Sequence, residues 1–217
     1  MKLSIITINR NNAIGLEQTI KSVISLKYSN FEYIVIDGAS TDNSIDIIRK
    51  YASSITFWIS EPDKGIYNAM NKAVDFASGE YIFFLNSGDI FTDGCSFDFM
   101  NNATTDFIFT SVIMNNKHIR IKSTPPKRLN KFDLYEGICH QATIIKRSVF
   151  IEQGKYDEEF KIIADWGLLI KAICLNKKSY TIVPETLVKY NTQGISSQAS
   201  MPVSYTHLRA HETLMNL

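Results

Sequence analysis

The chain has 217 residues, 45% of them hydrophobic, and its 23 basic residues nearly balance its 22 acidic ones, which leaves a net charge of +1. A chain of this length can bury the core of one domain without disulfide bridges, and its balanced charge argues against a nucleic acid as the main partner. The three cysteines, Cys95, Cys139 and Cys174, are odd in number and lack paired spacing, which favours a reducing compartment over a disulfide framework or a zinc site.

Strands and helices are predicted to alternate through residues 1–90. Apolar runs rich in β-branched and aromatic residues predict strands over 3–8, 33–36, 55–59 and 81–85, and helical patterns follow each of the first three. The run at 3–8 is too short for a signal peptide and far below the roughly 18 residues that span a bilayer, so we interpret it as the first core strand. Alternation with short connections is typical of a parallel α/β sheet.

The second half of the chain is less regular. A hairpin is predicted for 107–114 and 118–122, a strand for 142–145, and a helix for 162–175 with Asp165 in its first turn. We expect one domain over 1–202. The segment 203–217 does not continue the pattern; it is either a terminal helix or foreign sequence, and we leave it out of the fold prediction.

Polar residues follow the predicted strands at their carboxyl ends, where ligands bind in such sheets. They lie at Thr7 and Asn9, at Asp37, over 61–63, and over 86–89. Carboxylates gathered at one edge repel one another unless a cation offsets their charge, and Mg²⁺ or Mn²⁺ combines one or two carboxylates with phosphate oxygens. Taken singly, Asp89 also reads as a turn residue, Asp165 as a carboxylate favoured by the helix dipole, and His140 as a structural histidine.

Five segments together resemble a known family. SIITINRNN, EYIVIDGASTDNS, EPDKGIYNAMNKAVDFASGEYIFFLNSGD, CHQATIIKRSVF and ADWGLLIKA occur in the order seen in family 2 glycosyltransferases, and the resemblance covers about 1–197. Within that family, the sequence is similar to the branch that builds bacterial polysaccharides, including colanic-acid and O-antigen enzymes. The resemblance implies the GT-A fold, a Rossmann-like α/β/α sandwich with a mostly parallel central sheet. Its half 1–90 would bind the nucleotide sugar, and its half 91–202 the acceptor.

The resemblance also implies roles for single residues. Asp165 would be the catalytic base, and Asp89 would hold Mn²⁺ or Mg²⁺. Sugar contacts, to donor or acceptor, would come from His140, Gln141 and Trp166. The residues implied to bind the nucleotide sugar are Thr7, Asn9, Asp37 (on the base), Asp63, Asn71 and Asn86.

Two departures from the family pattern weaken these assignments. Asn86 and Gly88 stand where carboxylates are common in the metal motif, and Ala164 stands where glutamate usually precedes the catalytic aspartate. A lower metal affinity is therefore expected, while the base itself is kept.

The implied reaction is an inverting transfer from a nucleotide-diphosphate sugar to a hydroxyl of a glycan or lipid-linked acceptor, in bacterial surface polysaccharide synthesis. We expect a cytoplasmic protein and leave peripheral contact with the inner membrane face open. Five basic residues of the second half either approach anionic headgroups or a diphosphate-lipid acceptor, or form an ordinary solvated surface. They are Lys127, Arg128, Lys131, Lys146 and Arg147.

Two rival interpretations remain open. A sugar nucleotidyltransferase should carry a glycine-rich basic loop after its first strand, but residues 9–13 read NRNNA, and no dinucleotide or Walker loop is present. A glycosyltransferase-like module that binds nucleotide without turnover fits the thinned metal motif, whereas Asp165 in its helix argues against it.

Overall fold

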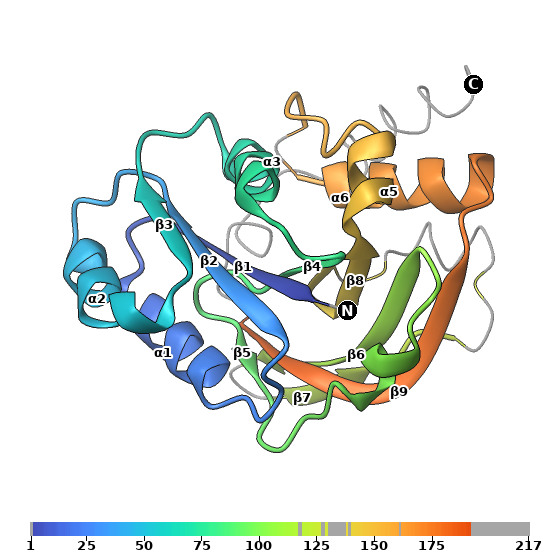
Figure 1. The fold of residues 1–217 in the computed structure, drawn as a ribbon, viewed down its shortest axis with the longest axis horizontal. Coiled ribbons are helices and arrows are strands. Elements are labelled where there is room, and N and C mark those ends of the chain that lie inside the picture. The colour runs from blue at the N-terminus through green and yellow to red at the C-terminus, as the bar shows by residue number, and fades with distance from the viewer. Residues whose placement is uncertain are drawn as a thin grey trace.

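The computed structural model describes residues 2–116, 119–126, 129, 138, 140–160 and 162–191. Over these residues the chain forms a nine-stranded sheet with helices on both faces (Figure 1), in the strand order β3-β2-β1-β4-β8-β6-β9-β5, with β7 paired to β6. The first half comprises β1 (Leu3–Asn9), α1 (Ala13–Ile24), β2 (Phe31–Asp37), α2 (Ser44–Lys50), β3 (Phe57–Ser60), α3 (Ile66–Phe76) and β4 (Tyr81–Phe84). The second half comprises β5 (Ile90–Phe91), β6 (Phe107–Asn116), β7 (Ile119–Ser123), β8 (Thr143–Lys146), α5 (Arg147–Glu152), α6 (Ala164–Leu169) and β9 (Tyr180–Asn191).

The first half confirms the predicted alternation of strands and helices. β3, β2, β1 and β4 lie side by side and run parallel, so their carboxyl ends meet at one edge of the sheet. The register places Asn9 opposite Asp37 and Asp37 opposite Ser60 at that edge. Side chains at paired positions of parallel strands point to the same face, so these three polar side chains lie together.

Both faces of this parallel block are buried, which explains its nearly continuous apolar strands. Alternate residues such as Ile6, Ile34 and Phe84 pack with α3, α5 and α6 on one face. Their neighbours, such as Ile5 and Phe83, pack on the other face with α1, α2 and the strands of the second half. The α/β layering implied by the resemblance is thereby confirmed.

Beyond β4 the sheet is mixed. β8 runs antiparallel to β4, β6 antiparallel to β8, β9 parallel to β6, and β5 antiparallel to β9. The sheet curls so that β5 comes to lie beneath α1 (Figure 1), and the rings of Phe83 and Phe91 stack at 5.7 Å. The predicted hairpin is confirmed as β6 and β7.

Two of the predicted elements begin two residues later than expected, and β5, α5 and β9 were not predicted. The third strand is Phe57–Ser60, because a 3-10 turn over Ala52–Ser54 delays its start. The helix expected over 162–175 begins at Ala164 and continues from Ile170 to Leu175 as a π-helix. Ile163 has φ 83°, a left-handed conformation that a β-branched residue rarely adopts, so the helix cannot begin before it.

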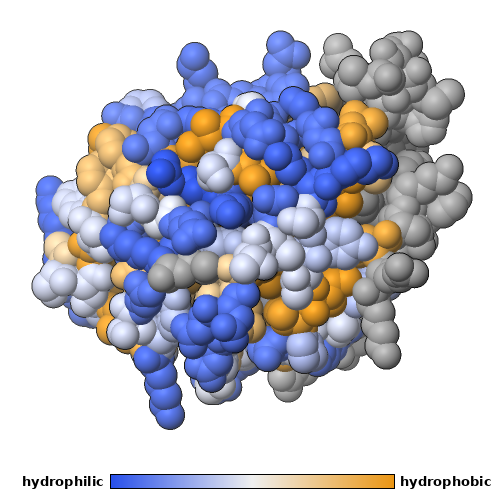
Figure 2. Space-filling model, turned by 45° about the vertical axis from the view of Figure 1, so that its right-hand side comes forward, coloured by the Kyte–Doolittle hydropathy of each residue, from blue (hydrophilic) through white to orange (hydrophobic). Residues whose placement is uncertain are grey.

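The described surface is mixed in polarity. On the face seen in Figure 2, hydrophobic residues form separate patches among hydrophilic ones. Within the described ranges, no helix has the length and apolar character needed to cross a membrane. Several predicted features lie outside those ranges: Cys139, Lys127, Arg128, Lys131 and the segment 203–217.

Candidate functional site at the carboxyl edge of the sheet

Asp37 ends β2 and is completely buried. Its Oδ1 accepts hydrogen bonds from Asn9 Nδ2 at 2.7 Å and Ser40 Oγ at 2.6 Å. Its Oδ2 accepts from the backbone N–H of Ser40 at 2.9 Å and from Ser60 Oγ at 2.7 Å. Protein donors therefore surround the carboxylate, so a nucleotide base that bonds to Asp37 must share an oxygen with a donor already in place.

Asp63 lies against the end of the same strand. A Cβ atom added at Gly38 would collide with the Asp63 carboxylate, so the glycine permits this close approach. Asp63 Oδ1 accepts from the backbone N–H of Gly65 at 3.0 Å and lies 3.8 Å from Arg10 Nη1. The loop after β3 is thus held next to the loop after β2, as the sequence predicted from the strand ends.

Asp89 lies in the turn after β4 and is only 3% exposed. Gly88, with φ 101°, lets the chain turn so that the Asp89 N–H reaches Asn86 O at 2.9 Å. Burial raises the pKa of the Asp89 carboxyl to about 7. A 2.9 Å hydrogen bond from the backbone of Asn191, the charge of His140 and a hydrogen bond from Gln141 offset only part of that effect. Asp89 is a buried carboxylate that is short of positive charge.

Asp165, the second residue of α6, is held by two side chains. Tyr67 on α3 donates its hydroxyl to Oδ1 at 2.9 Å, and His140 Nδ1 lies 2.9 Å from Oδ2. Burial raises the pKa of the Asp165 carboxyl, but the hydrogen bond and charge of His140 and the hydrogen bond of Tyr67 outweigh it and lower the pKa below its ordinary value. The side chains of Asp165 and His140 both remain 19% exposed.

His140 connects Asp165 to the Asp89 turn. Its Nε2 lies 3.4 Å from Asn86 Nδ2, three residues before Asp89. Burial lowers the pKa of the imidazole, whereas Asp165 and the charge of Asp89 raise it more, so the pKa lies above its ordinary value. The structure therefore brings Asn86, Asp89, His140 and Asp165 together at one place.

Four other residues that were predicted to contact substrates make hydrogen bonds or packing contacts within the protein. Thr7 is completely buried and donates to Leu85 O at 2.7 Å. Asn71 holds the turn after α5, because its amide bonds to both backbone groups of Tyr156 and to Glu158. Gln141 supports Asp89, and Trp166 is 7% exposed within the core cluster.

Two basic residues of the predicted cationic set lie elsewhere. Lys146 lies opposite Tyr81, the first residue of β4, in the antiparallel register of β4 and β8. Arg147 Nε donates to Gly79 O at 3.1 Å. Both are at the amino end of the parallel block, whereas the carboxylates gather at its carboxyl end. They are therefore not positioned beside Asp165.

The donor atoms at the carboxyl edge fit a divalent cation bound together with a phosphate. Among the residues that the structure describes, the buried Asn9 Oδ1 and Asn86 Oδ1 find no hydrogen-bond partner. Within the residues that the structure describes, no group of three His, Cys, Asp or Glu side chains could hold a metal by itself. Asp89 and Asn86 would therefore supply the protein oxygens, and phosphate or water the remaining ligands.

Sequence reasoning missed two residues of this site. Tyr67 lies among the apolar helical positions of α3, where nothing marks its hydroxyl as functional. Asn191 ends β9, a strand that was not predicted because Pro184 interrupts its pattern. The available signal was the enrichment of β-branched and aromatic residues over 180–190, which reads YTIVPETLVKY.

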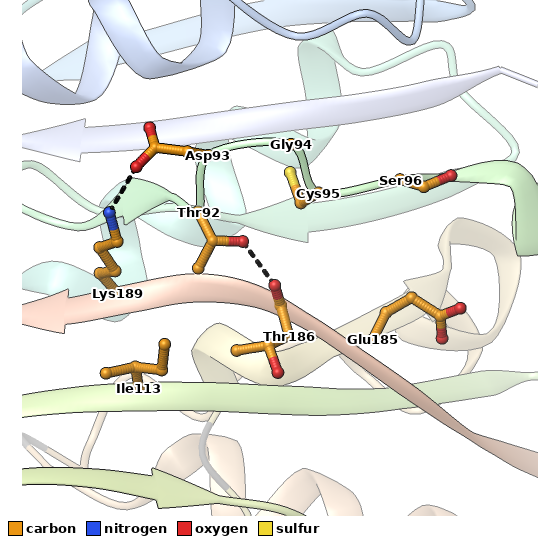
Figure 3. Close-up of a pocket in the computed structure, with 9 residues that line it drawn as sticks. All are labelled: Thr92, Asp93, Gly94, Cys95, Ser96, Ile113, Glu185, Thr186 and Lys189. Atoms are coloured by element: carbon orange, nitrogen blue, oxygen red, sulfur yellow. Dashed lines mark hydrogen bonds and ion pairs between the residues drawn. The ribbon is translucent and has the colours of Figure 1, made fainter.

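A hollow of about 470 Å³ lies further along β5 and β9, next to this site but outside it (Figure 3). The loop after β5 forms one wall, with the Lys189–Asp93 ion pair at 3.0 Å and the Thr92 hydroxyl bonded to Thr186 O. None of the predicted site residues lines it. The candidate site is therefore defined by its hydrogen bonds and charges, not by this hollow.

Known proteins resemble this chain in sequence. The model described as "Glycosyl transferase family 2" matches residues 4–154. A protein of Mycobacterium tuberculosis, named an uncharacterized glycosyltransferase, is 29% identical over 95% of this chain and 81% of its own length. A PGL/p-HBAD biosynthesis glycosyltransferase of Mycobacterium bovis is 28% identical over 77% of this chain and 68% of its own length.

Solved structures resemble it in fold. S. aureus TarS 1-349, in complex with UDP-GlcNAc, has a TM-score of 0.80 at 18% identity, covering 98% of this chain and 65% of that one. Mannosyltransferase PcManGT from Pyrobaculum calidifontis, in complex with GDP-Man and Mn²⁺, has a TM-score of 0.70 at 16% identity, covering 98% of this chain and 63% of that one. The chain thus spans slightly less than two thirds of either solved chain, and at these identities the likeness concerns the fold.

Proposed function

Since the chain belongs to glycosyl transferase family 2 and is a glycosyltransferase, we propose that it transfers a sugar, with inversion, from a nucleotide-diphosphate donor to a hydroxyl of a glycan or lipid-linked acceptor. One observation carries the proposal. A chain of close contacts runs from the Asp89 turn through Asn86 and His140 to Asp165. It links a buried carboxylate suited to a metal-bound diphosphate with a carboxylate suited to act as a base.

The first half, 1–90, would bind the donor. Asn9 and Asn86 have unpartnered buried amide oxygens at the ends of the neighbouring strands β1 and β4, and these could accept N–H groups or a cation. The complexes of TarS with UDP-GlcNAc and of PcManGT with GDP-Man support a nucleotide-diphosphate sugar as donor. In the proposal Asp37 frames this pocket, and Asp63 lies beside it.

Asp165 would be the general base. Its two oxygens offer about four acceptor positions, of which Tyr67, His140 and the backbone N–H of Trp166 take three, so one is left for the acceptor hydroxyl. Its lowered pKa keeps it ionised at neutral pH. As the acceptor oxygen bonds to the anomeric carbon, its proton passes to Asp165, and the sugar–phosphate bond breaks with its electron pair leaving on the nucleoside diphosphate. General-base assistance of this kind contributes about 10²–10⁴ in rate.

His140 and Tyr67 would orient the base. In the neutral imidazole, with Asn86 Nδ2 donating toward Nε2, the proton lies on Nδ1 and is donated to Asp165; the charged imidazole keeps the same Nδ1–H donor. The Tyr67 hydroxyl fixes the other oxygen. We therefore revise the expected sugar contact of His140 to an orienting role.

Asp89 and Asn86 would hold Mn²⁺ or Mg²⁺, which when bound would neutralise charge on the departing diphosphate. The raised pKa of Asp89 and the unpartnered Asn86 oxygen support this role. The complex of PcManGT contains Mn²⁺.

The second half, 91–202, would receive the acceptor. Asp165 lies on α6 in this half, with its side chain partly exposed. The relative named for PGL/p-HBAD biosynthesis supports an acceptor among cell-surface glycoconjugates, and surface polysaccharide synthesis is the setting we propose.

A nucleotide screen tests the proposal. Thermal unfolding would be followed with UDP, GDP, dTDP and the corresponding triphosphates, each with and without Mn²⁺, because a ligand that binds only the folded state raises the midpoint. The sugar nucleotides of the stabilising nucleotide would then be assayed for release of the diphosphate. We expect one nucleoside diphosphate to stabilise the fold when Mn²⁺ is present. We also expect slow release of that diphosphate from its sugar nucleotides. Stabilisation only by a nucleoside triphosphate would favour a nucleotidyltransferase. If a nucleotide binds but no sugar nucleotide releases its diphosphate with any acceptor tried, the protein is a non-catalytic binding module.

A further inference from the structure

The turn that carries Asp89 is held by side chains as well as by strand pairing. Its backbone groups, and that of Phe91 in β5, bond to polar side chains of Asn12, the N-cap residue of α1, and of α1 itself. Asn12 Nδ2 donates to Ser87 O at 3.1 Å, and Ser22 Oγ accepts from the backbone N–H of Phe91 at 3.2 Å. Buried backbone N–H and C=O groups without a hydrogen-bond partner destabilise the fold, so these side chains stabilise the turn.

Thr19, on α1 between these two positions, makes the central contacts. Its hydroxyl accepts the backbone N–H of Gly88 at 3.0 Å and donates to the backbone O of Asp89 at 2.7 Å. The one hydroxyl proton can serve one strong acceptor, and Asp89 O is nearer than Gly15 O, which lies at 3.0 Å in the preceding helical turn. Thr19 is completely buried, so no water can replace it.

These contacts hold the two residues that set the direction of the Asp89 side chain. Gly88 has φ 101°, and its backbone lies close to Asn191, whose own N–H binds the Asp89 carboxylate. Thr19 therefore holds the backbone of Gly88 and Asp89 from the helix side, while Asn191 holds the Asp89 carboxylate from the β9 side. Loss of the hydroxyl would leave the Gly88 N–H and the Asp89 carbonyl without this partner, while the contacts of Asn12 and Ser22 remain.

We propose that Thr19 is a positioning residue for donor binding, whose hydroxyl fixes the Gly88–Asp89 backbone and so aims the Asp89 carboxylate at the metal-bound diphosphate. The inference rests on the proposed function for its effect on affinity. The positioning itself depends only on contacts within the protein. Thr19 lies among the apolar residues Leu16, Ile20 and Val23 of α1, so its place in the sequence indicates only a helix.

Three variants test the proposal. Thr19→Val keeps the shape and removes the hydroxyl, Thr19→Ser keeps the hydroxyl, and Ser25→Ala removes an exposed hydroxyl at the end of the same helix. Amide hydrogen exchange at Gly88, measured by NMR, reports the hydrogen bond directly. Affinity for UDP and GDP, each with Mn²⁺, reports the consequence for the site.

We expect Thr19→Val to speed exchange at Gly88 by about tenfold and to weaken Mn²⁺-dependent nucleotide binding by a similar factor. Thr19→Ser should restore both, and Ser25→Ala should change neither. If Thr19→Val does not fold, Thr19→Ala replaces it as the hydroxyl-free variant.

Unchanged Gly88 exchange in a hydroxyl-free variant overturns the proposal. Faster exchange with wild-type nucleotide affinity also overturns it, because the hydroxyl would then be merely structural. If the wild type binds none of UDP, GDP and dTDP with Mn²⁺, the proposed donor site fails, and the role of Thr19 in affinity fails with it. Gly88 exchange still decides whether Thr19 fixes the turn.

Discussion

Asp37 at the end of β2 and Asp89 in the turn after β4, the two strands that flank β1, are both buried but differ in their surroundings. Asp37 is completely buried and accepts four hydrogen bonds from side chains and backbone of its own half. Asp89 is almost as buried, but its pKa is raised to about 7 because its donors do not offset burial. A buried carboxylate whose acceptor positions are all filled by protein hydrogen bonds has a structural role. A buried carboxylate without enough donors is stabilised when a cation binds to it.

The largest expected effect concerns Asp165 on α6, the proposed base. Asp165→Asn keeps the hydrogen bond from Tyr67 and the shape of the side chain but cannot accept a proton. We expect turnover to fall by about 10²–10⁴ while donor affinity changes little. Steady-state release of nucleoside diphosphate and calorimetric donor binding measure the two effects. Turnover within threefold of wild type would remove Asp165 from the role of base.

Because the two aspartates differ in this way, we expect substitution by asparagine to destabilise the protein at Asp37 but not at Asp89. Asp37→Asn turns an amide N–H₂ toward donors that need an acceptor, and we expect the free energy of unfolding to fall by about 2–4 kcal/mol. Asp89→Asn removes a poorly compensated charge, and without divalent ions we expect no loss of stability at pH 8. Urea unfolding with a chelator measures both. Equal losses in the two variants would show that the aspartates do not differ in this way.

The pH dependence of stability sharpens the same contrast. The folded protein binds the Asp89 proton more tightly than the unfolded chain does, since the pKa rises from 3.8 to about 7. The contribution of Asp89 to stability is therefore full below about pH 4 and falls as the pH rises toward 7, by at most about 1.4 kcal/mol per unit. Unfolding curves of wild type and Asp89→Asn between pH 5 and 8, with chelator, should diverge as pH rises. Parallel curves would contradict the raised pKa.

The smallest effect is expected at Gly38. Gly38→Ala places a methyl group against the Asp63 carboxylate, so the loop after β3 must shift. We expect a loss of about 1–3 kcal/mol in stability and a modest rise in the KM for donor, with kcat kept. Ala39 has φ 52° and is already an alanine, so Ala39→Gly is a matched control that relieves strain without filling space. No change in KM would place Asp63 outside the donor site.

The sequence predicted the arrangement of the strands better than the contacts of single side chains. Parallel strands bring their carboxyl ends to one edge whatever their side chains, so the strand pattern alone placed Asp37 and Asp89 at the same edge of the sheet. The role of Asn71 could not be predicted, because an amide on a helix reads the same whether it faces a ligand or, as here, the backbone of Tyr156. The link from His140 to Asp165 depends on contacts between distant segments, which no local pattern encodes.

The most direct test of the central claim is calorimetric binding of UDP and GDP at pH 8 to wild type and Asp89→Asn, each with and without Mn²⁺. The account predicts that one nucleotide binds the wild type tightly only with Mn²⁺, and that Asp89→Asn, though folded, loses this Mn²⁺ dependence together with most of the affinity. Equal, Mn²⁺-dependent binding by both proteins would contradict it, because the cation would then be held without Asp89.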